Sequence, residues 1–346
     1  GSATALPPVP NDPRTGLGAL AYQDGALPAF RHHYYVDLTP KIADVDFNAP
    51  SGDQWRTLLV GGLGKGGNRY FALDVTDPSA VTTEAAAATE VLWEFPPVGD
   101  TAIDMGYTYG KPIIAKTRAL FNGAWVVMVG SGYNNPSGVG KLYFLQASDP
   151  THYKMMSTGA GSAGSPAGLA HPAGYTQDFH NQLAEQIYAG DLLGNFWRFD
   201  VSDTTSDTHW SVGQYAQLIA PGGGGLQPVT TPPEIKIDVS NGIDRWVFVG
   251  TGKLYDESDL ADSQLQTMYA FRDGTASAPW VRRWTARPRG WSRCPQPTPR
   301  TTSALPTHPT RAGFMTFPPA PASSLRRRRL SALLPISQPS RRPIHV

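Results

Sequence analysis

The sequence feature that most constrains the fold is a strand, glycine turn and strand unit that occurs four times between Trp55 and Arg272. The four copies pair Trp55–Val60 with Arg69–Asp74, Trp125–Val129 with Lys141–Leu145, Gln186–Asp191 with Asn195–Asp200, and Trp246–Val249 with Thr267–Arg272. β-Branched and aromatic residues suit a pleated strand, and glycine supplies the positive φ that short hairpin turns require. The four hairpins therefore predict an all-β chain.

Further strand patterns flank these hairpins. They lie at Lys111–Ala115 and Glu234–Ile237 before a hairpin, and at Val91–Phe95, His209–Val212 and Pro279–Trp284 after one. Four strands per unit is the composition of a β-propeller blade, and irregular spacing is typical of blades with inserted loops. We predict an incomplete β-propeller of about four recognisable blades, with a β-sandwich of unrelated hairpins as the alternative. Only Glu84–Ala88 has a helical pattern.

One strand also predicts which of its faces is buried. Phe71, Leu73 and Val75 are apolar at alternate positions, whereas the residues between them are mixed. Because side chains alternate between the two faces of a strand, we expect these three to face the core.

Composition excludes several classes of protein. At 346 residues and 40% hydrophobic content the chain can bury a large core, and no apolar run approaches the roughly 18 residues that span a membrane. Cys294 is the only cysteine, which leaves no intrachain disulfide and no cysteine-based zinc site. The start, Gly1–Thr4, lacks the pattern of a signal peptide.

The charge is divided sharply along the chain. From Gly274 onward there are 13 arginines and no Asp, Glu or Lys. Since the whole chain carries +1, residues 1–273 carry −12. The same tail has 13 prolines, which remove hydrogen-bond donors from a sheet and so predict no regular sheet there.

Three interpretations of the tail are open. We favour an out-of-frame translation of GC-rich DNA, because Lys, Asn, Asp, Glu and Tyr are all missing from it. The alternatives are genuine disorder and a basic arm for nucleic acid, but no aromatic residues are interleaved with the arginines as in stacking sites, so we predict no nucleic-acid partner. The predicted division is an irregular lead-in over 1–30, a propeller over 31–285 and a disordered tail over 286–346.

An ordered series of motifs over about residues 31–273 resembles the C-terminal propeller of the PilY/PilC family, whose members are associated with type IV pilus biogenesis and the pilus tip. The motifs are Tyr34–Pro40, Asp44–Phe47, Trp55–Gly67, Tyr70–Pro78, Met105–Pro112, Gly130–Asn134, Tyr188–Asp200 and Gly250–Tyr255. The family's propeller usually has an earlier blade and continues beyond Arg272, and neither part is recognisable in this sequence.

The resemblance implies a non-enzymatic module that supports pilus assembly and surface adhesion. It implies pilins, minor pilins and a host or abiotic surface as partners, and an extracellular, pilus- or outer-membrane-associated location. Binding is expected in the insertion loops 133–140, 155–182 and 253–266, since loops on a rigid scaffold carry function. No catalytic residue is predicted.

The alternative is an enzyme fragment. Tyr70–Asp74 followed by Leu92–Phe95 also resembles the quinoprotein dehydrogenases, whose propellers hold pyrroloquinoline quinone and calcium. Those enzymes commonly use a vicinal cysteine pair, which Cys294 alone does not provide.

The resemblance also implies a calcium loop ahead of the Tyr188–Asp191 strand. The matching segment retains Asp178, Asn181 and Glu185 as candidate ligands but places Phe179 and Leu183 among them. Calcium needs six to eight oxygen ligands, so this set is a degenerate calcium loop, and packing of its apolar residues on a blade is the alternative.

Two other motifs are expected to be structural. Gly62, Gly64 and Gly67 match the spacing of a dinucleotide fingerprint, but a strand rather than a helix follows them, which predicts a turn. The acidic stretch Asp256–Asp262 has oxygens suited to a cation, and a solvated loop is the favoured interpretation.

Overall fold

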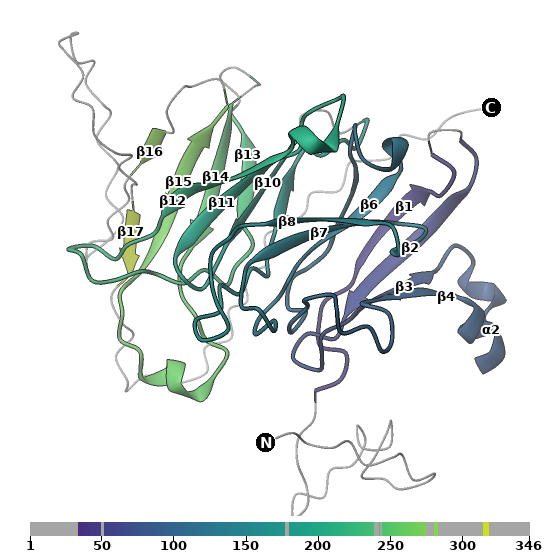
Figure 1. The fold of residues 1–346 in the computed structure, drawn as a ribbon, viewed down its shortest axis with the longest axis horizontal. Coiled ribbons are helices and arrows are strands. Elements are labelled where there is room, and N and C mark those ends of the chain that lie inside the picture. Colours follow the sequence, from purple (N-terminus) through teal and green to yellow (C-terminus); the bar gives the residue numbers. More distant parts are fainter. Residues whose placement is uncertain are drawn as a thin grey trace, which may run out of the picture.

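The chain folds into four antiparallel sheets of the kind that form propeller blades (Figure 1). The computed structural model describes residues 34–49, 52–176, 180–238, 242 and 244–274, and two further strands at Trp280–Arg282 and Phe314–Phe317. Blade 1 comprises β1 (Lys41–Asp46), β2 (Trp55–Gly62), β3 (Tyr70–Asp74) and β4 (Val91–Phe95); blade 2 comprises β5 (Ile113–Lys116), β6 (Trp125–Gly130), β7 (Lys141–Gln146) and β8 (Tyr153–Ser157). Blade 3 comprises β9 (Ala173–Tyr175), β10 (Gln186–Gly190), β11 (Asn195–Asp200) and β12 (Ser211–Gln217); blade 4 comprises β13 (Glu234–Ile237), β14 (Arg245–Gly250), β15 (Gln266–Asp273), β16 (Trp280–Arg282) and β17 (Phe314–Phe317), which also pairs with β15.

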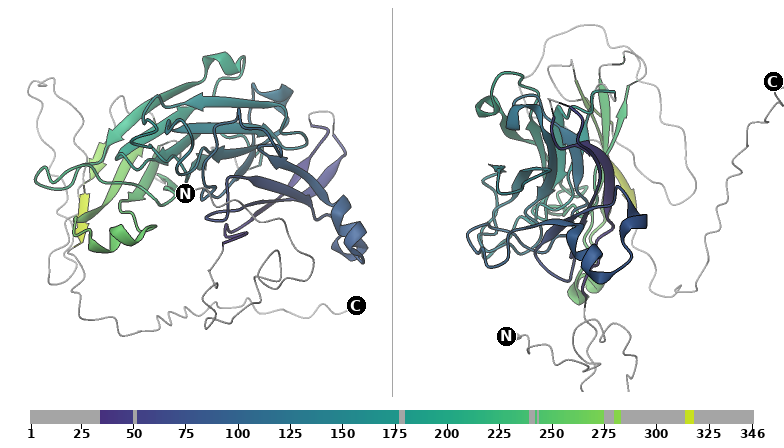
Figure 2. Two further views of the ribbon diagram at one scale, coloured as in Figure 1. Left: turned by 60° about the horizontal axis from the view of Figure 1, so that its bottom comes forward. Right: turned by 90° about the vertical axis from the view of Figure 1, so that its right-hand side faces the viewer.

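The blades pack face to face in chain order. Three buried clusters lie between successive blades: Tyr70 and Val127 belong to the first, Phe144 and Phe199 to the second, and Phe196 and Phe271 to the third. In the described part of the chain no such cluster joins blade 4 to blade 1. The blades therefore form an open arc, and the left view of Figure 2 shows the sheets following one another along this curve.

The sequence predicted the framework of this arc correctly. All four hairpins are present, and the flanking patterns became β4, β5, β12, β13 and β16. The predicted helical stretch is α2 (Glu84–Thr89), which Thr83 caps by accepting a hydrogen bond from the amide of Ala86. The sequence did not predict β1, β8 or β9, whose apolar patterns are weaker.

The predicted buried face of β3 is wrong. Tyr70, Ala72 and Asp74 are buried, whereas Phe71 and Leu73 are only partly buried. The reason is the neighbouring blade: the Tyr70 hydroxyl donates to the carbonyl oxygen of Gly110 over 2.8 Å, so a polar tip is satisfied inside the contact between blades 1 and 2. Alternation along one strand identifies two faces but not which one meets the next blade.

The third hairpin shows why an aspartate follows its first strand. Asp191 is fully buried, and its carboxylate accepts hydrogen bonds from the amide of Leu193, the amide and side chain of Asn195, and Nε1 of Trp197 at 2.8–2.9 Å. Burial nevertheless raises the pKa of Asp191. This carboxylate closes the turn, and positive φ at Gly194 completes it.

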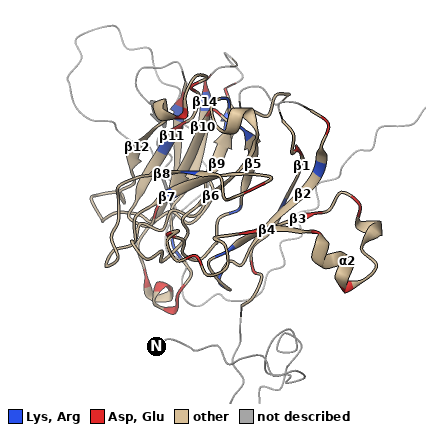
Figure 3. Ribbon diagram, turned by 45° about the vertical axis from the view of Figure 1, so that its right-hand side comes forward, with Lys and Arg blue, Asp and Glu red and all other residues tan. Residues whose placement is uncertain are grey.

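The fold accounts for both motifs expected to be structural. The predicted glycine turn is confirmed, since Gly64 has φ +59° and leads into β3. The prediction of a solvated acidic loop is confirmed for most of the stretch, since Asp256, Glu257 and Asp262 are exposed. Asp259 is the exception: it is buried in a capping box with Asp256, at the 3₁₀ helix Glu257–Ala261. Many of the other charged residues lie at strand ends and in loops, as the colouring of the ribbon in Figure 3 shows.

β17 lies within the tail for which proline predicted no regular sheet. Its four residues, Phe314–Phe317, contain no proline, so their amides can pair with β15. Among the described residues no helix is long and apolar enough to cross a membrane.

Seven connections meet at one end of the arc, which we call the loop face. They comprise the turns β2–β3, β6–β7, β10–β11 and β14–β15 and the links β4–β5, β8–β9 and β12–β13. Bridges connect neighbouring members of this set, as between Gly64 and Thr108, Tyr107 and Tyr133, and Val229 and Gly252. Loops distant in sequence are thus held side by side.

Candidate binding site

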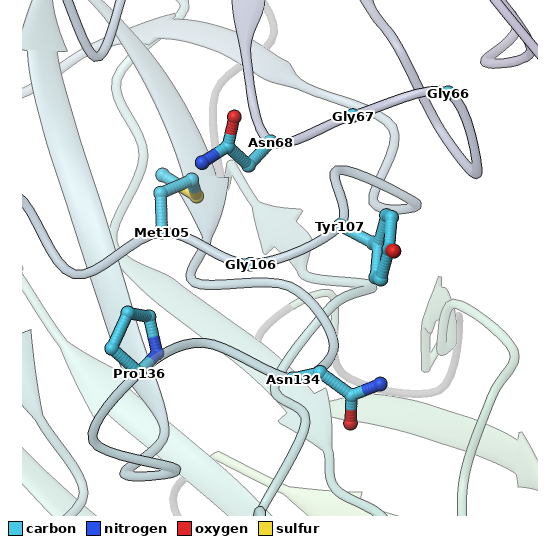
Figure 4. A pocket seen from close by; sticks show the side chains of 8 residues that line it. All are labelled: Gly66, Gly67, Asn68, Met105, Gly106, Tyr107, Asn134 and Pro136. Carbon is cyan, nitrogen blue, oxygen red and sulfur yellow. The ribbon is translucent and has the colours of Figure 1, made fainter. Parts of the chain in front are cut away.

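The loop face contains an open pocket where blades 1 and 2 meet (Figure 4). Its volume is about 440 Å³. Three segments line it: the β2–β3 turn with Gly66, Gly67 and Asn68, the β4–β5 link with Met105, Gly106 and Tyr107, and the β6–β7 turn with Asn134 and Pro136. Figure 4 shows Tyr107 and Asn134 on one side and Asn68, Met105 and Pro136 on the other.

Glycine is required where these segments cross. A Cβ at Gly106 would lie 2.1 Å from the carbonyl oxygen of Tyr133, and a Cβ at Gly132 would lie 2.1 Å from that of Tyr107. Both contacts are with backbone, which cannot move aside like a flexible side chain. The glycines therefore let the β4–β5 link and the β6–β7 turn interleave at the pocket.

A cluster of polar side chains supports the pocket from the β4–β5 link. The Asp104 carboxylate accepts hydrogen bonds from Nζ of Lys141, Nδ2 of Asn135, and the amide and hydroxyl of Ser137. Burial alone would raise the pKa of Asp104, but the hydrogen bonds from Lys141 and Ser137 outweigh it and lower the pKa. Asp104 is therefore ionised and fixes the β6–β7 turn.

An aromatic cluster adjoins the pocket and connects distant blades. The Tyr133 ring of blade 2 stacks on Tyr255 of the β14–β15 loop, with centroids 5.2 Å apart and an interplanar angle of 12°. Tyr109 and His171 also contact Tyr133, at 5.1 and 6.2 Å between centroids. Nζ of Lys253 lies 4.7 Å from the Tyr255 centroid, in a cation–π contact.

Burial changes the titration of this cluster. Tyr133 is 2% exposed, and its hydroxyl has no hydrogen-bond partner among the described residues. Burial raises the pKa of Tyr133 and lowers that of His171 to about 4. Both groups are neutral at physiological pH.

Two of the predicted calcium ligands, Asn181 and Glu185, lie at the opposite end of blade 3. The Asn181 side chain accepts a hydrogen bond from the amide of Leu183, and Glu185 pairs with Arg118 over 3.5 Å. Asp178 lies outside the described residues. In the ranges that the structure describes, no three His, Cys, Asp or Glu side chains gather as metal ligands would. Calcium binding at Asp178, Asn181 and Glu185 stays a prediction.

In the acidic stretch after β14, Asp259 forms an ion pair and hydrogen bonds within the protein. Nζ of Lys253 lies 2.8 Å from Oδ1 of Asp259, and Oδ2 of Asp259 accepts hydrogen bonds from the amides of Tyr255 and Asp256. These contacts fix the loop that carries Tyr255 to the aromatic cluster.

The four successive blades and the interleaved loop face define the chain as a β-propeller domain. A family model described as the PilY1 β-propeller domain matches residues 15–285, and the chain belongs to this family. The predicted family resemblance is thereby confirmed.

Relatives and a solved structure agree with this assignment. The chain is 33% identical over 281 residues to the type IV pilus biogenesis factor PilY1 of Pseudomonas aeruginosa (strain UCBPP-PA14), covering 74% of this chain and 22% of that protein. It is 32% identical over 281 residues to a PilY1 homolog of Xylella fastidiosa (strain Temecula1), covering 77% of this chain and 18% of that protein. The crystal structure of the Pseudomonas aeruginosa PilY1 C-terminal domain matches with a TM-score of 0.54 and 30% identity, covering 68% of this chain and 48% of that one. The chain thus spans about a fifth of the length of these curated relatives.

Sequence reasoning did not identify the pocket residues as a site. Met105–Pro112, Gly130–Asn134 and the glycine turn before β3 were recognised only as separate motifs. Their shared signal was a glycine beside an aromatic or amide residue, which also occurs in ordinary hairpin turns. Only the stacking of blade 1 on blade 2 brings them together.

Proposed function

We propose that this chain is a non-enzymatic propeller module of a type IV pilus biogenesis protein, and that it supports pilus assembly and surface attachment. The observation that carries the proposal is the family match over residues 15–285, together with four packed blades. The proposed location is the cell surface, in association with the pilus or the outer membrane.

The architecture suits binding rather than large motion. Buried clusters hold each blade against the next, and the loop face is built from segments that bridge one another. Two of the insertion loops expected to bind, 133–140 and 253–266, begin on the loop face, whereas 155–182 also contains the end of β8 and all of β9. A rigid scaffold with varied loops presents a binding surface at low entropic cost.

The proposed partners follow from the family. Pilins and minor pilins would be contacted during assembly, and a host or abiotic surface during attachment. Assembly and attachment are separable in experiments, because one concerns pilus number and the other concerns adhesion of piliated cells.

The experiment deletes the codons for residues 34–274 in frame from the parent gene, and pili are counted by electron microscopy alongside a twitching assay. Loss of pili, restored by the intact gene in trans, is the expected result. Unchanged pili and motility would contradict the assembly role. Dye reduction by the chain with pyrroloquinoline quinone and calcium tests the enzymatic alternative, and reduction above a heat-denatured control would contradict the non-enzymatic assignment.

A further inference from the structure

We propose that the pocket between blades 1 and 2 binds a neutral saccharide. This inference rests on the proposed attachment function and names the class of ligand for it. It is carried by the chemistry of the eight lining residues, their exposure, and the hydrogen bonds already made by the surrounding backbone.

The pocket presents no formal charge. None of its lining residues is Lys, Arg, His, Asp or Glu. The ionic groups adjacent to the lining residues in sequence are engaged elsewhere: Nζ of Lys65 lies 4.7 Å from the Tyr34 ring centroid, Nη1 of Arg69 donates to the carbonyl oxygen of Pro96, and Asp104 is paired with Lys141. A site for phosphate or carboxylate would present cations or convergent donors, so a neutral ligand is favoured.

The side chains supply the two kinds of contact that a sugar ring needs. Tyr107 is 43% exposed, and the face of its ring offers an apolar surface for the C–H face of a pyranose. The exposed amides of Asn68 and Asn134 each donate and accept hydrogen bonds, as vicinal hydroxyl groups do. Asn68 and Asn134 lie on opposite sides of the pocket in Figure 4.

The shape fits a small ligand at the surface. Gly66, Asn68, Tyr107, Asn134 and Pro136 are all exposed, which makes the pocket shallow, and about 440 Å³ has room for a mono- or disaccharide. The interleaved backbone fixes these residues before binding, which reduces the entropy lost when a ligand is ordered.

The backbone argues against an extended peptide as the ligand. A peptide that adds as a strand needs free amide and carbonyl groups along an edge. Here the amide of Gly106 donates to Ser131, that of Tyr107 donates to Tyr133, and that of Thr108 donates to Gly67. These groups are already paired, so recognition falls to the side chains.

Saturation-transfer difference NMR on the full chain tests the proposal, with methyl α-mannoside, methyl β-galactoside and N-acetylglucosamine as probes. We expect signal transfer to the ring protons of at least one sugar. Tyr107→Leu removes the aromatic face, and Asn134→Asp places a charge in the neutral pocket. Each is expected to weaken binding about tenfold or more, equivalent to ~1.4 kcal/mol.

Two matched controls separate binding from folding. Asn122 lies in the β5–β6 turn at the opposite end and has φ +56°, close to the +57° of Asn134, so Asn122→Asp imposes the same chemical change on the same backbone conformation. Tyr153 on β8 lies outside the pocket and is 42% exposed, which is similar to the 43% of Tyr107. Asn122→Asp and Tyr153→Leu are expected to retain binding.

No transfer to any probe, or transfer that survives both pocket substitutions, would overturn the saccharide proposal. Binding of a glycine- or proline-rich peptide that Tyr107→Leu abolishes, without sugar binding, would overturn it in favour of a peptide. Sugar binding in vitro with unchanged piliation after deletion of residues 34–274 would refute the assembly role alone. Loss of pili without sugar binding would refute the ligand alone.

Discussion

Replacing Arg245 with methionine removes a buried cation that joins blade 3 to blade 4. Nε of Arg245 donates to the Tyr188 hydroxyl over 2.7 Å, and Nη2 lies 3.0 Å from Oδ2 of Asp273. Its guanidinium also lies 4.4 Å from the Tyr175 ring centroid. The side chains of Arg245 and Asp273 are 7% and 9% exposed, so water cannot replace these contacts.

The expected cost follows from the charge left behind. Removing one partner of a buried ion pair costs roughly 3–5 kcal/mol, largely because the other charge stays buried without compensation. Asp273 keeps a second cation, since Nε of Arg198 lies 3.1 Å from the same oxygen. We therefore expect Arg245→Met to lower the free energy of unfolding by about 3 kcal/mol, at the lower end of that range.

Urea unfolding followed by circular dichroism measures this change, and Arg198→Met is the matched control. Arg198 pairs with the same carboxylate but is 32% exposed, so its loss should cost less than about 1 kcal/mol. Equal costs for the two substitutions, or a larger cost at Arg198, would refute the argument that burial determines the strength of the pair.

Three further predictions concern the loop face. Burial lowers the pKa of His171 from 6.5 to about 4, so its contribution to stability is complete above pH 6.5 and is lost as the pH falls toward 4, where the unfolded chain takes up the proton first. The expected loss in the free energy of unfolding is on the order of 3 kcal/mol, and His171→Gln should remove this pH dependence in urea titrations. Asp104→Asn leaves the Lys141 ammonium, 16% exposed, without its carboxylate and should lower the free energy of unfolding by about 2 kcal/mol, whereas a change near zero would contradict the role of the pair. Gly110→Ala places a Cβ 1.6 Å from the carbonyl oxygen of Ala170 in the β8–β9 link and should lower the free energy of unfolding by about 3 kcal/mol. Gly164→Ala is the control: nothing lies within 4 Å of its Cβ, so stability should change by less than about 0.5 kcal/mol, and similar melting-temperature shifts for the two variants would refute the close approach at Gly110.

The fold was predictable because its hairpins are local. The two strands of each hairpin are close in sequence and glycine marks their connection, so period and turn residues identify both strands without knowledge of the rest of the chain. β9 (Ala173–Tyr175) was missed because three residues are too few to show the alternation of apolar and polar residues that identifies a strand, and its pairing with β10 depends on the blade around it. The buried face of β3 was wrong for the same reason, because the neighbouring blade decides which face is covered.

The site was less predictable than the fold. Tyr107 and Asn134 are 27 residues apart in different turns, and the pocket exists only because blade 1 packs on blade 2. The role of Asp259 was also hidden, since a run of acids resembles a solvated loop until Lys253 is placed beside it. Sequence spacing predicts contacts within a hairpin but not contacts between loops of different blades.

Piliation of a strain whose gene lacks the codons for residues 34–274 tests the central assignment most directly. The account predicts that surface pili are lost and that the intact gene restores them. A normal number of pili on the deletion strain would contradict the assignment of this propeller to pilus biogenesis.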